Sequence, residues 1–149
     1  MKRLYPEQPV VGVGAIIVKD RQIALIKRGN EPSKGKWTVP GGLVELAESP
    51  EQAVVRETKE EVGLDVEGPI LIDVVSNVDY DEAGKIKYDY IIIDYFVHVK
   101  RGKDAQASSD AQELRWVPLE DVEKLELTPS FRRFFRHNRQ KLEVASSYP

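Results

Sequence analysis

Three glutamates stand close together in the middle of the sequence, at Glu57, Glu60 and Glu61. If this segment is helical, the spacing of i, i+3 and i+4 places the three carboxylates on one face. Like charges at this spacing repel each other by roughly a few tenths of a kcal/mol in an isolated helix. A hard divalent cation such as Mg²⁺ or Mn²⁺ would turn that repulsion into binding, because both ions prefer oxygen ligands. The pattern therefore predicts a cation site. The alternative is a solvated face with ion pairs, such as Arg56 with Glu60.

The residues that flank the glutamates predict a helix over residues 50–62. Ser49 is a favourable N-cap, and Gln52 three positions later completes a Ser-x-x-Gln capping box. Pro50 suits the first helical position, and Gly63 suits the position just past the end. The face beside the glutamates is expected to pack inward and carries Val54, Val55, Thr58 and Val62.

A fixed pattern runs through this helix and the turn before it. Its residues are Gly42, Glu48, Arg56, Glu57, Glu60, Glu61, Gly63 and Leu64. The pattern resembles the Nudix box, G-x5-E-x7-R-E-U-x-E-E-x-G-U, in which U is a bulky aliphatic residue. The one departure is Thr58 at the first U. Residues 27–28, 35–42 and 113–119 resemble other parts of the same family, so the resemblance covers about residues 10–122.

Membership of this family would imply an α/β fold with a mixed sheet (α+β), built as a Nudix-type α/β/α sandwich. A single domain is expected over residues 1–149. The implied reaction is attack of water on a diphosphate linkage, with Mg²⁺ or Mn²⁺ neutralising phosphate charge and acidifying a bound water. The chain has no cysteine and only two histidines, which excludes a thiolate zinc site.

The resemblance assigns roles to residues of the box. Glu57 and Glu61 are the expected main metal ligands, with Glu60 as a third. The backbone carbonyl of Gly41 is a further candidate ligand, because a carbonyl is a hard donor and glycine allows close approach. Arg56 is expected to orient the neighbouring carboxylates.

The box does not fix which carboxylate takes the proton from the attacking water. Glu60 and Glu61 are both candidates. In this family the general base often lies outside the box, which adds Asp110 and Glu113 near the late strand. The alternative for these two residues is that they are exposed charges on a loop and at a strand end.

Three residues outside the box are candidates for substrate binding. Arg28 ends a predicted strand, where its guanidinium would grip a diphosphate; the alternative is a surface arginine. Trp37 and Tyr80 are candidates for stacking on a base, and Tyr88 and Tyr90 are also available as stacking partners.

The box specifies the reaction better than it specifies the substrate. The leading hypothesis is a small-molecule nucleotide in which a nucleoside diphosphate is linked to another group, as in ADP-ribose. The runner-up is a nucleoside triphosphate, including an oxidised one, cleaved to monophosphate and pyrophosphate. A hypothesis of another class is a non-catalytic nucleotide-binding module. Such modules usually carry a damaged box, and this one is intact at its acidic positions.

Composition and charge agree with one soluble enzyme domain. The chain has 149 residues, of which 41% are hydrophobic and 32% charged, as is typical of a globular protein that buries a core. The net charge of −3 gives no general attraction for nucleic acid. The apolar run at residues 10–18 is too short to span a membrane, and the lack of cysteine fits a reducing cytoplasm. A homodimer, common among similar proteins, is compatible with these observations.

The remaining pattern predicts strands around the box and a helix near the C-terminus. Strands are expected at residues 10–19, 22–27, 37–39, 66–78, 87–99 and 113–117. A short acidic turn is expected at residues 119–122, followed by a helix over residues 128–142. Phe131, Phe134 and Phe135 share one face of that helix, which predicts that it docks on the core and does not bind nucleic acid or membrane.

Overall fold

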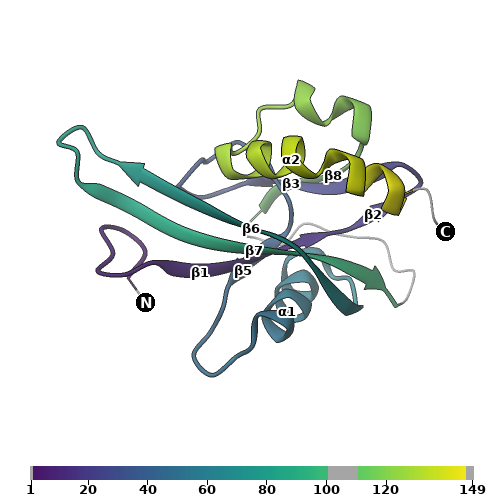
Figure 1. The fold of residues 1–149 in the computed structure, drawn as a ribbon, viewed down its shortest axis with the longest axis horizontal. Coiled ribbons are helices and arrows are strands. Elements are labelled where there is room, and N and C mark those ends of the chain that lie inside the picture. The colour runs from purple at the N-terminus through teal and green to yellow at the C-terminus, as the bar shows by residue number, and fades with distance from the viewer. Residues whose placement is uncertain (1, 101–110, 147–149) are drawn as a thin grey trace.

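The computed structural model describes residues 2–100 and 111–146, and its strands form two sheets. The first sheet has the order β5-β1-β7-β6, with β1 and β7 parallel and the other pairs antiparallel. Its strands are β5 (Gly41–Leu43), β1 (Val10–Ile16), β7 (Ile86–Val99) and β6 (Val66–Tyr80). β6 and β7 form a long hairpin that extends to the left in Figure 1. The predicted mixed sheet is therefore present.

The second sheet is built around β3 and is antiparallel. β3 pairs with β2, β4 and β8. The strands are β2 (Val18–Lys19), β3 (Gln22–Arg28), β4 (Trp37–Thr38) and β8 (Ala111–Pro118).

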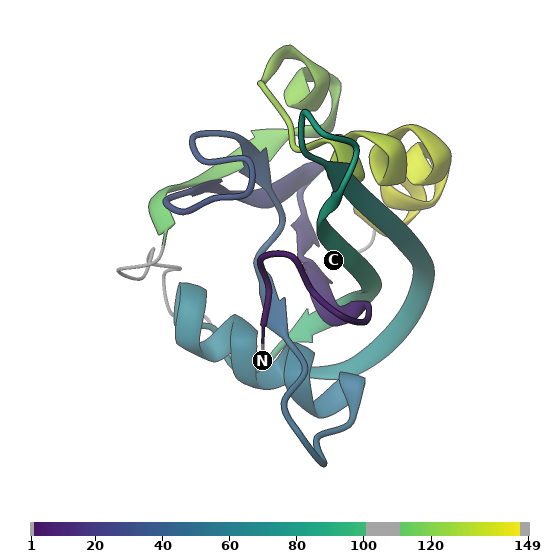
Figure 2. The same cartoon turned by 90° about the vertical axis from the view of Figure 1, so that its left-hand side faces the viewer.

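Two α-helices lie on opposite sides of the strands. α1 (Pro50–Val62) lies below the first sheet in Figure 1, whereas α2 (Pro129–Ser146) lies above it, and Figure 2 shows the same separation from the side. A 3₁₀ helix, η1 (Leu119–Lys124), leads from β8 toward α2. This arrangement of helices on both sides of mixed sheets agrees with the expected α/β/α sandwich. Within residues 2–100 and 111–146, no helix is both long and apolar enough to cross a membrane.

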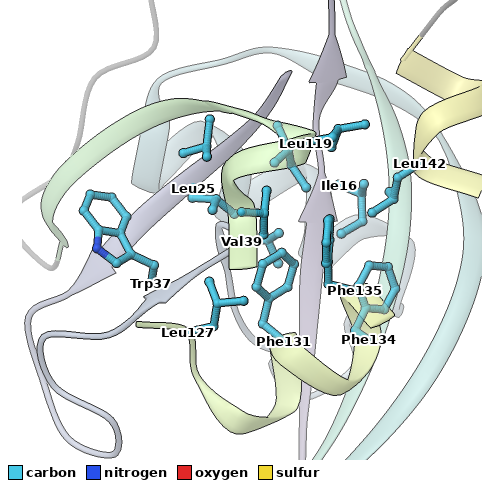
Figure 3. Packing of buried hydrophobic residues seen from close by; sticks show 13 residues of the cluster. Ile16, Leu25, Trp37, Val39, Leu119, Leu127, Phe131, Phe134, Phe135 and Leu142 are labelled. Carbon is cyan, nitrogen blue, oxygen red and sulfur yellow. The ribbon is translucent and has the colours of Figure 1, made fainter. Parts of the chain in front are cut away.

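Two apolar clusters fill the spaces between the sheets and the helices. Along β1, Val13 and Ala15 face the cluster that also contains Val54 and Val62 of α1. Ile16 faces the opposite cluster, which α2 covers. This alternation is the period-two pattern of a strand buried on both faces. Figure 3 shows the α2 side of the core, where three phenylalanine rings of α2 meet Ile16 and Val39.

The prediction that the C-terminal helix docks on the core is confirmed. Phe131, Phe134 and Phe135 are all buried. The centre of the Phe131 ring lies 6.1 Å from the centre of each of the other two rings. Removing the apolar surface of each aromatic side chain from water stabilises the folded state by on the order of 2–3 kcal/mol. These phenylalanines therefore anchor α2.

Two strand predictions were wrong in detail. Residues 10–19 do not form one strand, because the chain leaves the first sheet after Ile16 and enters the second sheet at Val18. No strand was expected between residues 40 and 65, yet Gly41–Leu43 forms β5 and pairs with β1. Glycine permits this close pairing, since a Cβ on Gly41 would lie 2.0 Å from the carbonyl oxygen of Val13.

Candidate functional site

The acidic helix α1 begins and ends at the predicted residues. The Ser49 hydroxyl accepts a hydrogen bond from the Gln52 backbone N–H at 3.1 Å, and the Gln52 side chain accepts one from the Ser49 N–H at 2.9 Å. Gly63 closes the helix in the left-handed conformation, with φ of 74°. These caps fix the start and the end of the helix, and thereby the positions of its glutamates.

Two of the three glutamates face the loop that precedes the helix. The Glu61 carboxylate accepts a hydrogen bond from the Gly41 backbone N–H at 2.8 Å. The Glu57 carboxyl lies against Gly42 so closely that a Cβ on Gly42 would be 2.2 Å from Glu57 Cδ. The two glycines of β5 therefore make room for two carboxylates that line one cavity.

Arg56 holds several acidic residues at once, as its predicted orienting role requires. Its guanidinium donates to both carboxylate oxygens of Glu48, at 2.7 and 2.9 Å, in a bidentate pair. It also donates to Glu57 at 2.7 Å, to Glu60 at 3.1 Å and to the carbonyl oxygen of Leu43 at 3.0 Å. The pair with Arg56 lowers the pKa of Glu48 to about 2. Arg56 thus ties the helix to the residues just before it.

Glu57 is held in a partly buried position beside Arg56. Burial raises the pKa of the Glu57 carboxyl, and the hydrogen bond from Arg56 acts in the opposite direction. A bound cation would favour the ionised form of this carboxyl in the same way as Arg56 does.

Glu60 does not join the other two glutamates. Its side chain is 60% exposed and pairs with Arg56, and it is not part of the cavity wall. The helical rotation of about 100° per residue places Glu60 and Glu61 on opposite sides of Glu57. Among the described residues no three acidic or histidine side chains converge in a way that would hold a metal. The expectation of three convergent carboxylates is therefore not met.

The cavity that receives Glu57 and Glu61 has a volume of about 830 Å³. This size is within the usual range for small-molecule sites. Residues of β1, β3, β5, β6, β7, α1 and the start of α2 form its wall, so both sheets and both helices contribute. Arg28, at the end of β3, also lines it. The Arg28 Nε donates to the carbonyl oxygen of Pro32 at 2.7 Å, and burial lowers the pKa of the guanidinium.

A second arginine in the wall was not predicted from the sequence. The Arg3 Nε donates to the Tyr90 hydroxyl at 2.9 Å, and its guanidinium carbon lies 5.9 Å from the centre of the Tyr90 ring. The positive charge of Arg3 helps to lower the pKa of Arg28, so the two cations face one region of the cavity. Nothing in the sequence near Arg3 marks it, because the contact depends on where the N-terminal segment lies against β7.

The cavity wall also contains a buried carboxyl on β7. Asp94 is only 4% exposed, and its pKa is raised to about 7 by burial and by the negative charge of Asp73. The signal that marks Asp94 in the sequence is its charge within an apolar strand, since its neighbours are Ile93 and Tyr95.

The chain matches a known protein family over most of its length. The family model described as NUDIX domain matches residues 8–137, most of the chain. The chain belongs to the Nudix family. Proteins of this family and its named relatives are hydrolases that act on phosphorus anhydrides, and this protein is accordingly a Nudix hydrolase.

Individual relatives match this chain over different lengths. An ADP-ribose pyrophosphatase of Methanocaldococcus jannaschii is 42% identical over 123 residues, which is 83% of this chain and 69% of that protein. An 8-oxo-dGTP diphosphatase of Proteus vulgaris is 37% identical over 68 residues, 45% of this chain and 61% of that protein. The crystal structure of a MutT NUDIX hydrolase from Burkholderia pseudomallei has a TM-score of 0.76 at 35% identity, and the match covers 87% of this chain and 98% of that chain.

The aromatic residues lie differently from expectation. Trp37 is 5% exposed and packs in the core that Figure 3 shows, with the Arg115 guanidinium 4.8 Å from its ring centre, so the ring has no face open to a substrate. Tyr80 is 63% exposed near the tip of the β6–β7 hairpin and does not line the Nudix cavity. Of the four aromatic residues named as stacking partners, Tyr90 is the one in the cavity wall.

Of the two acidic residues predicted outside the Nudix box, Glu113 and Asp110, the structure describes the first. Glu113 on β8 is 41% exposed, pairs with Arg115 at 2.7 Å and does not line the cavity. Its side chain is therefore an exposed strand charge, the alternative considered above. Asp110 lies outside the described residues.

Proposed function

We propose that this Nudix hydrolase cleaves a nucleoside diphosphate linked to another group, with ADP-ribose as the leading substrate. One observation carries the proposal: the Glu57 and Glu61 carboxylates open into the same cavity as the Arg28 guanidinium. Carboxylates and a guanidinium in one cavity suit a phosphate chain whose negative charge is shared between a metal and an arginine. The identity of 42% to an ADP-ribose pyrophosphatase supports the choice of substrate.

A divalent cation, Mg²⁺ or Mn²⁺, is the proposed cofactor. The donors available are oxygens, from Glu57, Glu61 and the backbone carbonyl of Gly41, which suits these ions. Gly42 supports this assignment, because any larger residue would occupy the position of the Glu57 carboxyl. When bound, the cation would neutralise charge on the diphosphate and make a water molecule more acidic.

Arg28 is the proposed phosphate-binding residue. Its Nε is already bound to the Pro32 carbonyl, which orients the guanidinium plane at the cavity wall. Its terminal nitrogens make no hydrogen bond within residues 2–100 and 111–146, so they are available to phosphate oxygens.

Glu61 is the proposed proton acceptor among the box carboxylates. The hydrogen bond from the Gly41 N–H fixes one oxygen of Glu61, and the side chain lines the cavity. Glu60 points away and Glu113 is exposed, so neither is placed to reach a water molecule in the cavity.

A second candidate function is hydrolysis of a nucleoside triphosphate, including an oxidised one. The similarity to an 8-oxo-dGTP diphosphatase favours it, over less than half of this chain. The same cavity and carboxylates would serve, and the difference lies in which groups flank the broken bond.

Product identity separates the two reactions. The purified protein would be incubated with Mg²⁺ and, separately, ADP-ribose and 8-oxo-dGTP. We expect AMP and ribose 5-phosphate from ADP-ribose. A nucleoside monophosphate and inorganic pyrophosphate from 8-oxo-dGTP, at a much higher kcat/KM, would favour the second reaction. Binding of either nucleotide without any product would instead indicate a non-catalytic module.

A further inference from the structure

Asp94 is a buried carboxyl without a partner that would explain it. The side chain is 4% exposed, and no hydrogen bond or ion pair to it occurs within the described residues. Every fully enclosed polar side-chain atom in that part of the chain has a partner, so the Asp94 oxygens must reach the cavity surface. Leaving such a group unpaired is unfavourable, and a hydrogen bond from a bound ligand would offset that cost.

The strand register places Asp94 on the same row as Gly41 of β5. Asp94 pairs with Gly14 on β1, and Gly14 pairs with Gly41 on β5. The distance from Asp94 to Gly41 is thus two strand spacings, about 10 Å. A Cβ on Gly14 would lie 2.1 Å from an Asp94 oxygen. Because Gly14 has no side chain, the Asp94 carboxyl can lie over it, between β7 and β5.

The wall around Asp94 is mostly apolar. Val39, Ile92, Val75 and Phe131 line the cavity near this row, and Ile92 lies two residues from Asp94 on the same face of β7. A flat, apolar group that ends in hydrogen-bonding atoms fits such a wall, whereas a ribose carries hydroxyls on several sides. The wall therefore favours a nucleobase.

The neighbouring polar residues are already engaged. Asp73, opposite Asp94 on β6, accepts hydrogen bonds from the Asn138 side chain and from the Val74 N–H, both at 2.8 Å. Asn138 also donates to the carbonyl oxygen of Phe134. These bonds explain Asp73 as a residue that joins β6 to α2, whereas Asp94 lines the cavity without such bonds.

We propose that Asp94 determines base specificity by accepting a hydrogen bond from the exocyclic amino group of an adenine-type base. The inference rests on the proposed function, because it assumes that the diphosphate lies beside Glu57 and Glu61. The span of about 10 Å along the row is comparable to the reach of an adenylate from its phosphate to the amino edge of its base. A protonated Asp94 would also donate to the ring nitrogen beside that amino group, giving two hydrogen bonds to one edge.

The test uses two ligands that differ only at the amino group, AMP and purine riboside 5′-monophosphate. Their dissociation constants would be measured by titration calorimetry on the wild-type protein and three variants. We expect the wild type to bind AMP about three- to tenfold more tightly, the size of one hydrogen bond. Asp94→Ala should bind both ligands equally. Asp94→Asn keeps an acceptor, and Asp73→Asn changes the adjacent carboxyl, so both should retain the preference.

Three results would overturn the inference: equal binding of the two ligands by the wild type, an unchanged preference in Asp94→Ala, or loss of the preference in Asp73→Asn. In the second case, an equal weakening of both ligands would assign the Asp94 contact to the ribose that both ligands share. Thermal melting would check folding, and Asp94→Val, which suits a strand, would replace Asp94→Ala if the latter does not fold.

Ligand binding is measured here without turnover, which separates this inference from the proposed reaction. A protein that binds AMP with an Asp94-dependent preference but does not cleave ADP-ribose would refute the reaction alone. A protein that cleaves ADP-ribose but shows no preference at the amino group would refute the role of Asp94 alone.

Discussion

The backbone N–H of Gly41 donates a hydrogen bond of 2.8 Å to the Glu61 carboxylate, although 20 positions separate the two residues. The bond joins the glycine turn of β5 to the last turn of α1. It fixes one carboxylate oxygen before any ligand arrives, and such pre-organisation is a large source of catalytic power.

Removing divalent cations should abolish activity. The Glu57 and Glu61 carboxylates and the Gly41 carbonyl are oxygen donors that suit Mg²⁺ or Mn²⁺. We expect no hydrolysis of ADP-ribose in excess EDTA and full recovery when Mg²⁺ or Mn²⁺ is added back, as followed by chromatography of AMP. Full turnover in EDTA would contradict the proposed mechanism.

Glu61→Gln should lose most activity and keep its fold. The amide still accepts the hydrogen bond from Gly41 but lacks the charge that a cation requires. We expect kcat/KM to fall by at least the ~10- to 100-fold typical of changes around a metal site. Circular dichroism and thermal melting should match the wild type. Near-normal kcat/KM in the folded variant would show that Glu61 has no role in the reaction.

Gly42→Ala tests whether the glycine turn makes room for a carboxylate. The added methyl group would lie 2.2 Å from Glu57 Cδ, so the carboxyl must move. A displacement of about 1 Å at a catalytic group can lower activity by about 10²-fold. The matched control is Gly12→Ala, whose methyl group would approach no closer than 3.3 Å to the Gly42 carbonyl oxygen. Equal activities of the two variants would indicate that the position of Glu57 is unimportant.

Glu113→Gln should have nearly normal activity. Glu113 is exposed, pairs with Arg115 and lies outside the cavity wall. We expect kcat to change by less than about twofold, against the roughly 10²- to 10⁴-fold contribution of a general base. Measuring Asp110→Asn in parallel tests the remaining acidic candidate outside the box. A 10²-fold loss of kcat in Glu113→Gln, at saturating substrate and Mg²⁺, would assign the base to β8 after all.

The helix of the box could be predicted to the residue because its signals are local. Ser49, Gln52, Pro50 and Gly63 act through contacts with residues at most a few positions away, and all four contribute as predicted. Thr58 shows the limit of a pattern. Its side chain is fully buried where an aliphatic residue is usual, and its hydroxyl donates to the Val54 carbonyl at 2.6 Å, so helix geometry provides the partner it needs.

The cavity wall could be predicted only in part, because most of it depends on contacts between distant strands. Trp37 and Tyr90 are both large aromatic residues in the sequence, yet the sheet register buries the first in the core and places the second beside Arg3. Asp94 was not predicted, and the one signal for it in the sequence is its charge within an apolar strand. Its opening to the cavity follows from its pairing with Gly14, which no local pattern reveals.

The stability of the protein should fall as the pH rises from about 4 to about 7, in part because of Asp94. Burial and Asp73 raise the pKa of Asp94 from an ordinary value of 3.8 to about 7 in the folded state. Between these values the folded protein holds a proton that the unfolded chain has released, so raising the pH favours unfolding. The penalty is complete above about pH 7 and, at about 1.4 kcal/mol per pKa unit, amounts to roughly 4 kcal/mol.

Asp94→Asn should remove this dependence, because the amide does not ionise. Urea unfolding at about pH 5 and about pH 8 would give the free energy of unfolding of both proteins. The difference in free energy of unfolding between the variant and the wild type should shift in favour of the variant by roughly 2–4 kcal/mol between about pH 5 and about pH 8. Asp81→Asn is a matched control, because hydrogen bonds from the Lys85 N–H and the Tyr5 hydroxyl lower the pKa of Asp81 below its ordinary value of 3.8. This carboxyl is ionised in both the folded and unfolded states between these pH values, so its replacement should leave the pH dependence unchanged. Parallel curves for the wild type and Asp94→Asn would mean that Asp94 ionises as freely in the folded protein as in the unfolded chain.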